Sequence, residues 1–568
     1  MKRFFCISIL LITGVCAANS LETPSHFNYG HLRRIPILEG GRYKPFDTFA
    51  GESIKTITGR WKFNGNDPIA LYLLMMVREE IVDAEIVRVD YMPLKEALGL
   101  DEGKLHFSFN VLVSKFLQTD WKERISRTFR TEKELSRIER EVNVLNNKLN
   151  LMQAIISGEA LTIVPPPPGS DENATWYSIM RIEGYPQPAR DDLQKTYDWM
   201  LTAFKTGNAE EFERSSSELK ERLAQLNPSL YSAENIDREV RYNRSRPFLK
   251  AWMYYLPAFF LFLISLSFAG NKLYWGAFFP FAAGFAYHTY GLLIRGLIAG
   301  RPPVTNMYES VVFAGWGIIA FAFVFELIYR QRWFVISASA LGVAVLILAD
   351  ILPFDANIEP LQPVLRSNYW LIIHVLTITI SYSAFALATA LAHVVLAAYF
   401  YLPHRRELLK QLSLFIYRTL QAGAIFLAAG TVLGGVWAAE SWGRFWGWDP
   451  KETWSLISLL GYMAILHARY TGWIRDFGTA VCSVLGFWLI LMTWYGVNYI
   501  LTSGLHTYGF GSGGVVYVLG YMLFETAFLL VVAWKYHNNP RFLAACLITN
   551  DESADKAPAG SEKEFSLE

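Results

Sequence analysis

The chain has 568 residues, of which 52% are hydrophobic and 15% aromatic, and its mean hydropathy is +0.21. This composition excludes an ordinary soluble protein of that size and predicts a mainly α, polytopic membrane protein. The 52 basic and 51 acidic side chains nearly cancel, so the net charge gives no support for a nucleic-acid partner.

The first residues have the layout of a secretory signal peptide. Lys2 and Arg3 precede an apolar run, and small residues follow before position 19. We expect a signal peptide over residues 1–18, with an uncleaved signal anchor as the alternative. Either arrangement predicts that residues 19–247 are exported.

The four cysteines give little chemistry. Cys6 and Cys16 lie in the predicted signal, Cys482 in an apolar stretch and Cys546 near the C-terminus. This distribution predicts neither a disulfide framework nor a cysteine metal site, and Cys482 is interpreted as a small core residue.

The exported segment is predicted to be a helical domain. Between Arg130 and Ile156, apolar residues recur at alternating steps of three and four, which predicts a helix with one apolar stripe. These residues are Leu135, Ile138, Val142, Leu145, Leu149 and Met152. A run of prolines at 165–168 then predicts a break, and a second helical block is expected over 191–226.

From about residue 249 the chain contains apolar stretches of the length that crosses a hydrocarbon core, which takes about 20 helical residues. We predict nine spans within a transmembrane domain over 248–538, and a cytoplasmic tail over 539–568. The predicted spans are 250–269, 273–296, 308–329, 333–350, 370–401, 415–439, 453–469, 477–500 and 514–535.

The basic residues support this count, because cytoplasmic loops are enriched in Lys and Arg. With the N-terminal domain outside, every predicted inner loop is basic and the C-terminus lies inside. The inner-loop residues are Lys272, Arg330, Arg332, Arg405, Arg406, Lys410, Arg469, Arg475, Lys535 and Arg541.

The most unusual segment is the predicted outer loop 434–454, which contains Trp437, Trp442, Trp446, Trp448 and Trp454. Tryptophans often anchor membrane proteins at the interface. Anchoring does not explain the glycines, the Asp449-Pro450 break and the charges among them. We interpret the segment as an aromatic platform for a large planar ligand, whose carboxylates Arg444 or Lys451 would meet.

Two histidines bracket this segment on the same predicted side. His374 lies about one turn inside the fifth span, and His506 follows the eighth. Each alone would be a hydrogen-bonded packing residue. A pair at matching depth beside an aromatic platform is what the two axial ligands of a haem iron require.

Other histidines lie along the predicted spans. His288 shares the second span with Arg295, and His467 lies near the inner end of the seventh, where haem would enter. Ionisable groups at such depth are costly and are functional candidates. We interpret His393 and His404 as structural.

With Arg301–Ser310 (RPPVTNMYES) and Gly504–Phe510 (GLHTYGF), the tryptophan-rich segment resembles the WWD signature of haem-handling membrane proteins. Over roughly 273–535 the chain resembles the CcsA (ResC) component of system II cytochrome c synthase. The resemblance implies a bacterial cytoplasmic membrane, with the WWD segment and the exported domain on the periplasmic side. It also implies haem b in transit from the cytoplasmic side.

The resemblance further implies roles for particular residues. His374 and His506 would be the external iron ligands, and His467 the transmembrane haem histidine. The remaining members of the implied haem site are Trp437, Trp442, Trp446, Trp448, Trp454, Asp449, Arg444 and Lys451.

The implied activity is that of a holocytochrome c synthase (haem lyase) component, which attaches haem to the Cys-x-x-Cys-His motif of apocytochrome c. A second transmembrane histidine would come from a CcsB (ResB) protein. Because one span precedes the CcsA-like part, we expect that protein to be a separate partner. Thiol-reducing maturation proteins are further expected partners, and the role of the exported domain stays open.

Two alternatives compete with this interpretation. One is a haem transporter or relay without synthase activity, which would yield no thioether. The other is a non-haem, proton-coupled transporter in which His288, Arg295 and His467 form a proton path and the tryptophans are anchors. That transporter would be colourless.

Overall fold

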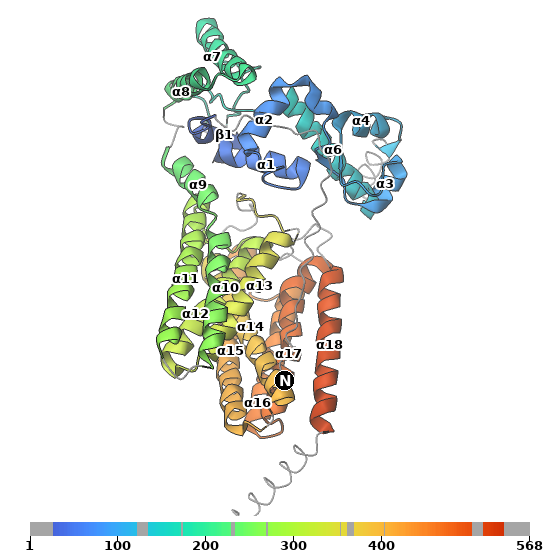
Figure 1. Cartoon of the computed structure of the whole chain (residues 1–568), viewed down its shortest axis with the longest axis vertical. Helices are drawn as coiled ribbons and strands as arrows, with labels where there is room; N and C mark the ends of the chain where they lie inside the picture. The colour runs from blue at the N-terminus through green and yellow to red at the C-terminus, as the bar shows by residue number, and fades with distance from the viewer. Residues whose placement is uncertain are drawn as a thin grey trace, which may run out of the picture. The chain divides into compact units, whose positions relative to one another are not determined.

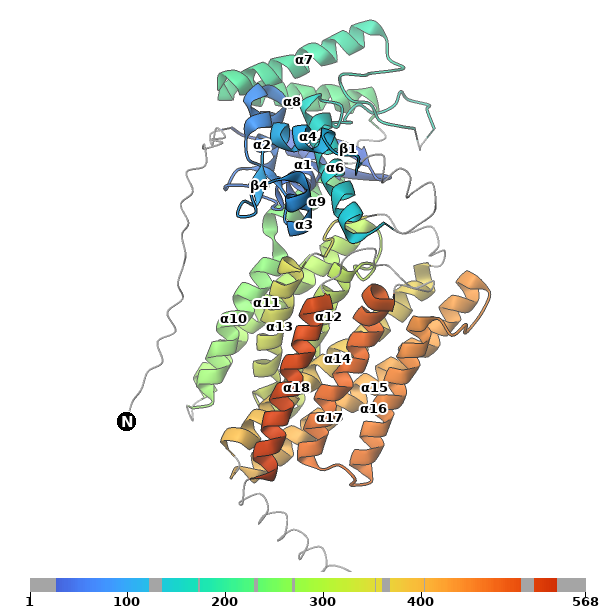
Figure 2. The same cartoon turned by 90° about the vertical axis from the view of Figure 1, so that its right-hand side faces the viewer.

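The chain divides into two units, Met1–Arg244 and Ser245–Glu568, which are drawn in Figures 1 and 2. The predicted signal peptide, His506 and the C-terminal tail lie outside the residues that the computed structural model describes. The described residues are 27–121, 135–171, 174–228, 233–267, 271–352, 354–359, 368–402, 404–501 and 515–538.

The first unit is mainly helical and also contains two small antiparallel sheets that the sequence did not predict. Strand β1 (Pro36–Glu39) pairs with β2 (Arg42–Pro45), and β3 (Val87–Arg88) pairs with β4 (His106–Phe107). Gly40 and Gly41 join β1 to β2 with φ of 59° and 76°, the left-handed conformation that such a tight hairpin requires. The helices are η1 (Leu32–Arg34), α1 (Phe46–Thr58), α2 (Pro68–Val77), η2 (Glu79–Asp83), α3 (Met92–Leu98), α4 (Phe109–Leu117), α6 (Arg137–Ile156), α7 (Gln187–Thr206), α8 (Ala209–Leu226) and α9 (Ala233–Ser245).

The predicted amphipathic helix of this unit is α6. Ser136 and Glu139 form a reciprocal capping box at its start, which satisfies backbone N–H groups that no helical carbonyl can reach. Its apolar stripe is buried at Val142, Leu145 and Met152. The second predicted block is two helices, α7 and α8, because the chain turns at a glycine between them.

The second unit is a bundle of helices that run side by side in Figures 1 and 2. Within the described ranges, eight helices are long and apolar enough to cross a membrane, which agrees with a polytopic α-helical membrane protein. They are α10 (Pro247–Ser265), α11 (Asn271–Ala299), α12 (Met307–Tyr329), α13 (Trp333–Ile351), α14 (Asn368–Tyr401), α15 (Arg406–Trp442), α17 (Asp476–Leu491) with the π-helix η3 (Met492–Leu501), and α18 (Val515–His537).

The ninth predicted span corresponds to α16 (Pro450–Tyr470), which packs against α15 and α17. Its 21 residues extend roughly 31 Å at 1.5 Å per residue, about the thickness of a hydrocarbon core. Lys451, Glu452 and Arg469 near its ends make it less apolar than the other eight helices. Helix α16 is therefore long enough to cross a membrane, but it is more polar than the other predicted spans.

Glycines on α15 allow α14 and α15 to approach closely. A Cβ atom at Gly430 would lie 3.0 Å from the backbone of Ile378, and one at Gly423 would lie 2.6 Å from the ring of Phe385. A Cβ at Gly434 would lie 2.6 Å from Cε1 of His374. Small residues at such positions let helix backbones pack tightly in a membrane.

An ion pair between a half-buried histidine and a buried glutamate joins α18 to α14. His393 places Nε2 2.9 Å from the Glu525 carboxylate and Nδ1 2.8 Å from the Thr389 carbonyl oxygen. Both ring nitrogens of His393 face hydrogen-bond acceptors. The His393–Glu525 pair must therefore carry one more proton than a neutral imidazole beside an ionised carboxylate. This supports the structural interpretation of His393.

We predict that His393→Ala lowers the free energy of unfolding by about 2 kcal/mol, because it leaves the buried Glu525 carboxylate without its cation. Thermal unfolding of the full chain in detergent measures the effect. The exposed His404 provides the control, and His404→Ala should unfold like the wild type. Equal melting temperatures for the two variants would contradict the prediction.

Candidate functional site

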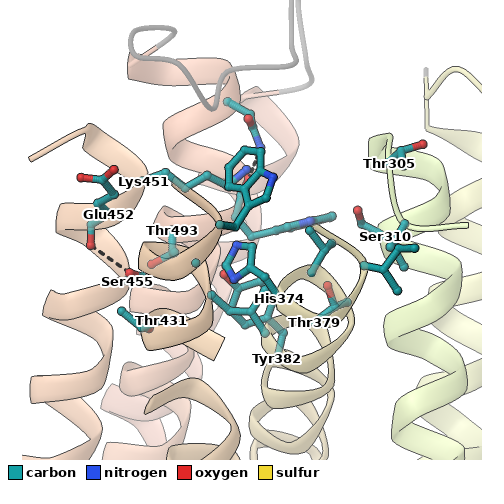
Figure 3. A pocket seen from close by; sticks show the side chains of 18 of the residues that line it. Thr305, Ser310, His374, Thr379, Tyr382, Thr431, Lys451, Glu452, Ser455 and Thr493 are labelled. Atoms are coloured by element: carbon teal, nitrogen blue, oxygen red, sulfur yellow. Dashed lines mark hydrogen bonds between the residues drawn. The ribbon is translucent and has the colours of Figure 1, made fainter. Parts of the chain in front are cut away.

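A cavity opens at the end of the second unit where α12, α14 and α16 begin and α15 and η3 end (Figure 3). Its open space is about 1190 Å³, including the part continuous with solvent. Five separate stretches of the chain form its walls: the segment 301–310, the start of α14, the end of α15, residues 446–455 and η3. The cavity therefore joins parts of the sequence that lie almost 200 residues apart.

His374 projects from the first turns of α14 into this cavity (Figure 3). Its Nδ1 lies 2.8 Å from the carbonyl oxygen of Gly430 on α15. A carbonyl can only accept a hydrogen bond, so Nδ1 carries the proton and the lone pair of the neutral ring is on Nε2. A backbone carbonyl on the other ring nitrogen is the arrangement that orients histidines as metal ligands.

Aromatic side chains form part of the wall beside His374. Trp437, which is buried, lies almost parallel to the His374 ring, with 6.3 Å between centroids and 8° between planes. Trp442 packs edge-on against Trp437 at 4.6 Å, and Trp446 lines the cavity from the next loop. These flat faces suit a planar, largely apolar ligand.

One buried carboxylate organises the wall on the α12 side. Glu309 accepts hydrogen bonds from Arg295 Nε at 2.8 Å and from the backbone N–H and the hydroxyl of Thr305 at 2.9 and 2.8 Å. Arg301 also forms an ion pair with Glu309 and lines the cavity. Two guanidinium groups therefore contact one carboxylate beside the cavity.

Lys451 lines the cavity from the start of α16. In Figure 3 it lies on the other side of His374 from Thr305 and Ser310. Cationic side chains therefore reach the cavity from two of its walls. Such a cavity can bind a ligand that combines a flat apolar body with negatively charged groups, and His374 adds a ligand for a metal at its centre.

The tryptophan-rich segment is a loop only over residues 443–449. Helix α15 continues to Trp442, where Gly443 ends it with φ of 72°, and α16 begins at Pro450. The predicted loop over 434–454 is therefore wrong at both ends. The physical reason is that Gly434 and Gly435 are tolerated inside a helix that packs closely on its neighbour.

Glu452 holds this short loop in place. It accepts hydrogen bonds from the backbone N–H groups of Gly447 and Asp449 at 2.7 and 3.2 Å, and it pairs with Arg444 at 3.2 Å. Asp449 is buried and accepts from the Lys451 N–H at 3.0 Å, which completes a capping box. Asp449 and Arg444 thus stabilise the loop and do not line the cavity.

The predicted site residues divide into two groups. His374, Trp437, Trp446 and Lys451 line the cavity. The other described ones lie around it or away from it, and His506 is outside the described residues. Those that do not line the cavity are Trp442, Arg444, Trp448, Asp449, Trp454 and His467.

Two further histidines on helices of the second unit lie away from the cavity. His467 is exposed near the far end of α16, with Nδ1 2.7 Å from the Met463 carbonyl oxygen. His288 is buried, and its nitrogens lie 3.0 Å from the Val312 carbonyl oxygen and 3.3 Å from the Tyr255 hydroxyl. Those two bonds join three helices, so His288 is a packing residue of the bundle.

Sequence reasoning missed Arg301, Glu309 and Glu452 as members of the site. For Glu452 a signal was present, because Asp449-Pro450-Lys451-Glu452 is the pattern of a helix N-terminus with a capping box. Arg301 and Glu309 lie in the motif Arg301–Ser310, but no local pattern in that motif indicates that their side chains meet at the cavity.

Comparisons with known proteins point in one direction. The profile of the family described as cytochrome C assembly protein matches residues 304–506, which include most of the cavity wall. Cytochrome c biogenesis protein CcsA of Prochlorococcus marinus (strain NATL1A) is 34% identical over 297 residues, covering 45% of this chain and 93% of that protein. CcsA of Guillardia theta is 35% identical over 243 residues, covering 38% of this chain and 79% of that protein.

A longer relative extends the match. Protein NrfI of Wolinella succinogenes is 30% identical over 513 residues, covering 83% of this chain, which includes part of the first unit. The chain spans about half of NrfI, since the alignment covers 53% of that protein. Among solved structures, a chain of cytochrome c heme lyase CcmF aligns with 51% of this chain and 50% of its own length at 18% identity, with a TM-score of 0.36. A TM-score of this size does not establish a common fold.

We predict that Glu452→Ala releases the 443–449 loop, because it removes the acceptor of two backbone N–H groups and of Arg444. The expected cost is about 2 kcal/mol of unfolding free energy. Limited proteolysis should detect faster cleavage within 443–449, and thermal unfolding should detect the loss of stability. The exposed Glu440 gives the matched control, Glu440→Ala, which should leave both unchanged. Cleavage at the wild-type rate would refute the role of Glu452.

Proposed function

The chain belongs to the CcsA family of cytochrome c biogenesis proteins, and on that premise we propose that it binds haem at His374 and positions it for covalent attachment to apocytochrome c. Haem is the substrate in this proposal, since it leaves on the product. The observation that carries the proposal is His374 itself, with its Nδ1 proton fixed by Gly430 and its ring in the cavity wall.

The walls of the cavity match the parts of haem. Trp446 offers an aromatic ring to the porphyrin, Trp437 packs behind the His374 ring, and Nε2 of His374 offers an electron pair to the iron. Arg301 and Lys451 supply positive charge for the two propionates.

The proposed reaction adds each thiol of a Cys-x-x-Cys-His motif across one vinyl group of haem. An S–C bond and a C–H bond form, while the S–H bond and the π bond of the vinyl group break, so no oxidant or reductant is consumed. The contribution of this chain is orientation. Holding the vinyl carbons beside the thiols makes a bimolecular encounter local, which can lower the barrier by several kcal/mol, up to about 10.

A complete haem site requires more than the described residues of this chain. His506 is the proposed second external ligand, and His467 the proposed ligand at the other end of the bundle. His467 is exposed in the bundle, which is consistent with a site that a second membrane protein completes. We propose a CcsB-like partner for that role.

We propose that the protein lies in the cytoplasmic membrane of a bacterium, with the cavity and the first unit on the periplasmic side. The supporting observation is the position of basic side chains at the ends of the membrane-spanning helices. Arg330, Arg332, Arg405 and Arg475 lie at the opposite ends of the spans from the cavity, and basic residues favour the cytoplasmic side.

We predict that His374→Ala abolishes the low-spin absorption of the reduced haem complex, because the iron loses an axial ligand. Spectra of the full chain, purified alone and with a CcsB-like protein, provide the measurement. Added imidazole should restore the low-spin bands in His374→Ala, and the exposed control His404→Ala should match the wild type. An unchanged spectrum in His374→Ala would reject His374 as a ligand.

We also predict that Lys451→Gln raises the dissociation constant for haem about tenfold, as expected for the loss of one charge-assisted hydrogen bond. Haem dimethyl ester, whose propionates carry no charge, should bind the variant and the wild type equally. Titrations followed by absorption measure both ligands, with Lys410→Gln on the exposed start of α15 as the control. Equal losses for haem and for its ester would show that Lys451 does not meet a propionate.

The decisive product is a covalent one. Co-expression with an apocytochrome and a CcsB-like protein should give a haem-stained cytochrome band that resists denaturation. Haem binding without such a band would favour a relay, and a colourless protein in both preparations would refute the proposed function.

A further inference from the structure

Two buried hydroxyl groups face the cavity without a hydrogen-bond partner. Thr379 and Tyr382 line the cavity from α14 and are 4% and 8% exposed. Neither hydroxyl forms a hydrogen bond within the described part of the chain. The other hydroxyl groups of the cavity wall all have a protein acceptor, and they belong to Thr305, Ser310, Thr431, Ser455 and Thr493.

Hydroxyl groups elsewhere on α14 are satisfied by the helix itself. Thr377, Ser381 and Ser383 donate to carbonyl oxygens three or four residues earlier, at 2.6 to 3.0 Å. These three residues do not line the cavity. Since a buried polar group without a partner is costly and rare, the hydroxyls of Thr379 and Tyr382 indicate a partner inside the cavity.

The two hydroxyl groups lie on the inner side of the cavity. Tyr382 is eight residues further along α14 than His374, which corresponds to about 12 Å along the helix axis. Figure 3 shows both hydroxyl residues below His374, on the side away from Lys451. Val375 and Ile378, on the same stretch of α14, make this part of the wall apolar. A few polar groups placed in an apolar wall are what fixes the orientation of a bound ligand.

The structure of haem determines which of its groups could reach these hydroxyls. Haem carries its two propionates on neighbouring pyrroles and its two vinyl groups on the other two pyrroles. The thiols of the client belong to a polypeptide and reach the haem from the opening of the cavity, so the vinyl groups must face that opening. A propionate then points inward, where its oxygens can only accept hydrogen bonds and require donors.

We propose that Tyr382 and Thr379 donate hydrogen bonds to one haem propionate on the inner side of the cavity and thereby turn the vinyl groups toward the opening. The proposal rests on the proposed function, because it assigns the orientation of haem in that site. Lys451, which lies nearer the opening in Figure 3, then meets the second propionate. Hydrogen bonds to an ionised carboxylate are roughly twice as strong as neutral ones, so two hydroxyl donors suffice to select one orientation.

Tyr382→Phe tests the proposal because it removes only the hydroxyl. In absorption titrations of the full chain with its CcsB-like partner, we expect the dissociation constant for haem to rise about tenfold. Haem dimethyl ester should bind the variant and the wild type with similar constants, since an ester accepts only a weak hydrogen bond. An unchanged constant for haem would overturn the proposal and leave water as the partner of Tyr382. Equal losses for haem and its ester would place the hydroxyl against another part of haem and would also overturn it.

Tyr462→Phe is the matched control. Its hydroxyl, on α16, is buried and likewise has no hydrogen bond in the described residues, but Tyr462 does not line the cavity. This control should bind haem like the wild type. Without haem, Tyr382→Phe should melt no lower than the wild type, because it loses only an unpartnered polar group. A lower melting temperature would assign the hydroxyl to the packing of the bundle and reject its role toward haem.

A double variant tests the orientation itself. If Lys451 and Tyr382 meet different propionates, the losses of affinity in Lys451→Gln and Tyr382→Phe should multiply when the two are combined. A double variant no weaker than the weaker single variant would place both residues on one propionate and overturn the orientation.

The haem spectrum separates this proposal from the proposed function. Tyr382→Phe should keep the low-spin absorption at saturating haem, because the iron ligands are untouched, whereas His374→Ala should lose it. A wild type that binds haem beside an unaffected Tyr382→Phe would overturn the orientation alone. A wild type that binds no haem would refute the proposed function and the orientation together.

Discussion

The close approach of α14 and α15 is the constraint on which the cavity depends. Side chains are missing at Gly423, Gly430 and Gly434, where a Cβ would meet atoms of α14 at 2.6 to 3.0 Å. The same approach brings the Gly430 carbonyl within 2.8 Å of His374. The packing of α14 against α15 therefore fixes two things: the distance between the helices and which nitrogen of His374 carries the proton. Both follow because tightly packed helices hold their side chains and carbonyl groups in one arrangement.

Two carboxylates, the buried Glu309 and the half-buried Glu452, fix the loops beside the cavity. Glu309 holds the 301–306 segment through Arg295, Arg301 and Thr305, and Glu452 holds the 443–449 loop through two N–H groups and Arg444. A charged group with this many partners is costly to leave unpaired, so each network is either complete or strongly unfavourable. These charged networks thus fix the cavity walls that lie outside regular helices.

The sequence predicted the large features because they depend on local patterns. Runs of apolar residues gave the spans, and steps of three and four gave α6, with its stripe at Val142 and Met152. It could not predict that Arg301 and Trp446 share a cavity, since 145 positions separate them and no local pattern encodes that contact. The two small sheets were missed for a related reason: two- and four-residue strands are too short to show an alternating pattern. Trp448 and Trp446 look alike in sequence, and only the backbone conformation of the loop directs one ring outward and the other to the cavity.

The π-helix η3 gives the cavity wall a dependence on residue count. Its hydrogen bonds join residues five apart, so Thr493 and Asn498 lie on the same side of the helix and both face the cavity. In a regular α-helix of 3.6 residues per turn the same two residues would diverge by roughly 140°. One residue gained or lost between Leu491 and Asn498 would therefore exchange the side chain presented there for that of a neighbour. Among homologues, the length of this stretch should vary less than the identity of its outward-facing residues.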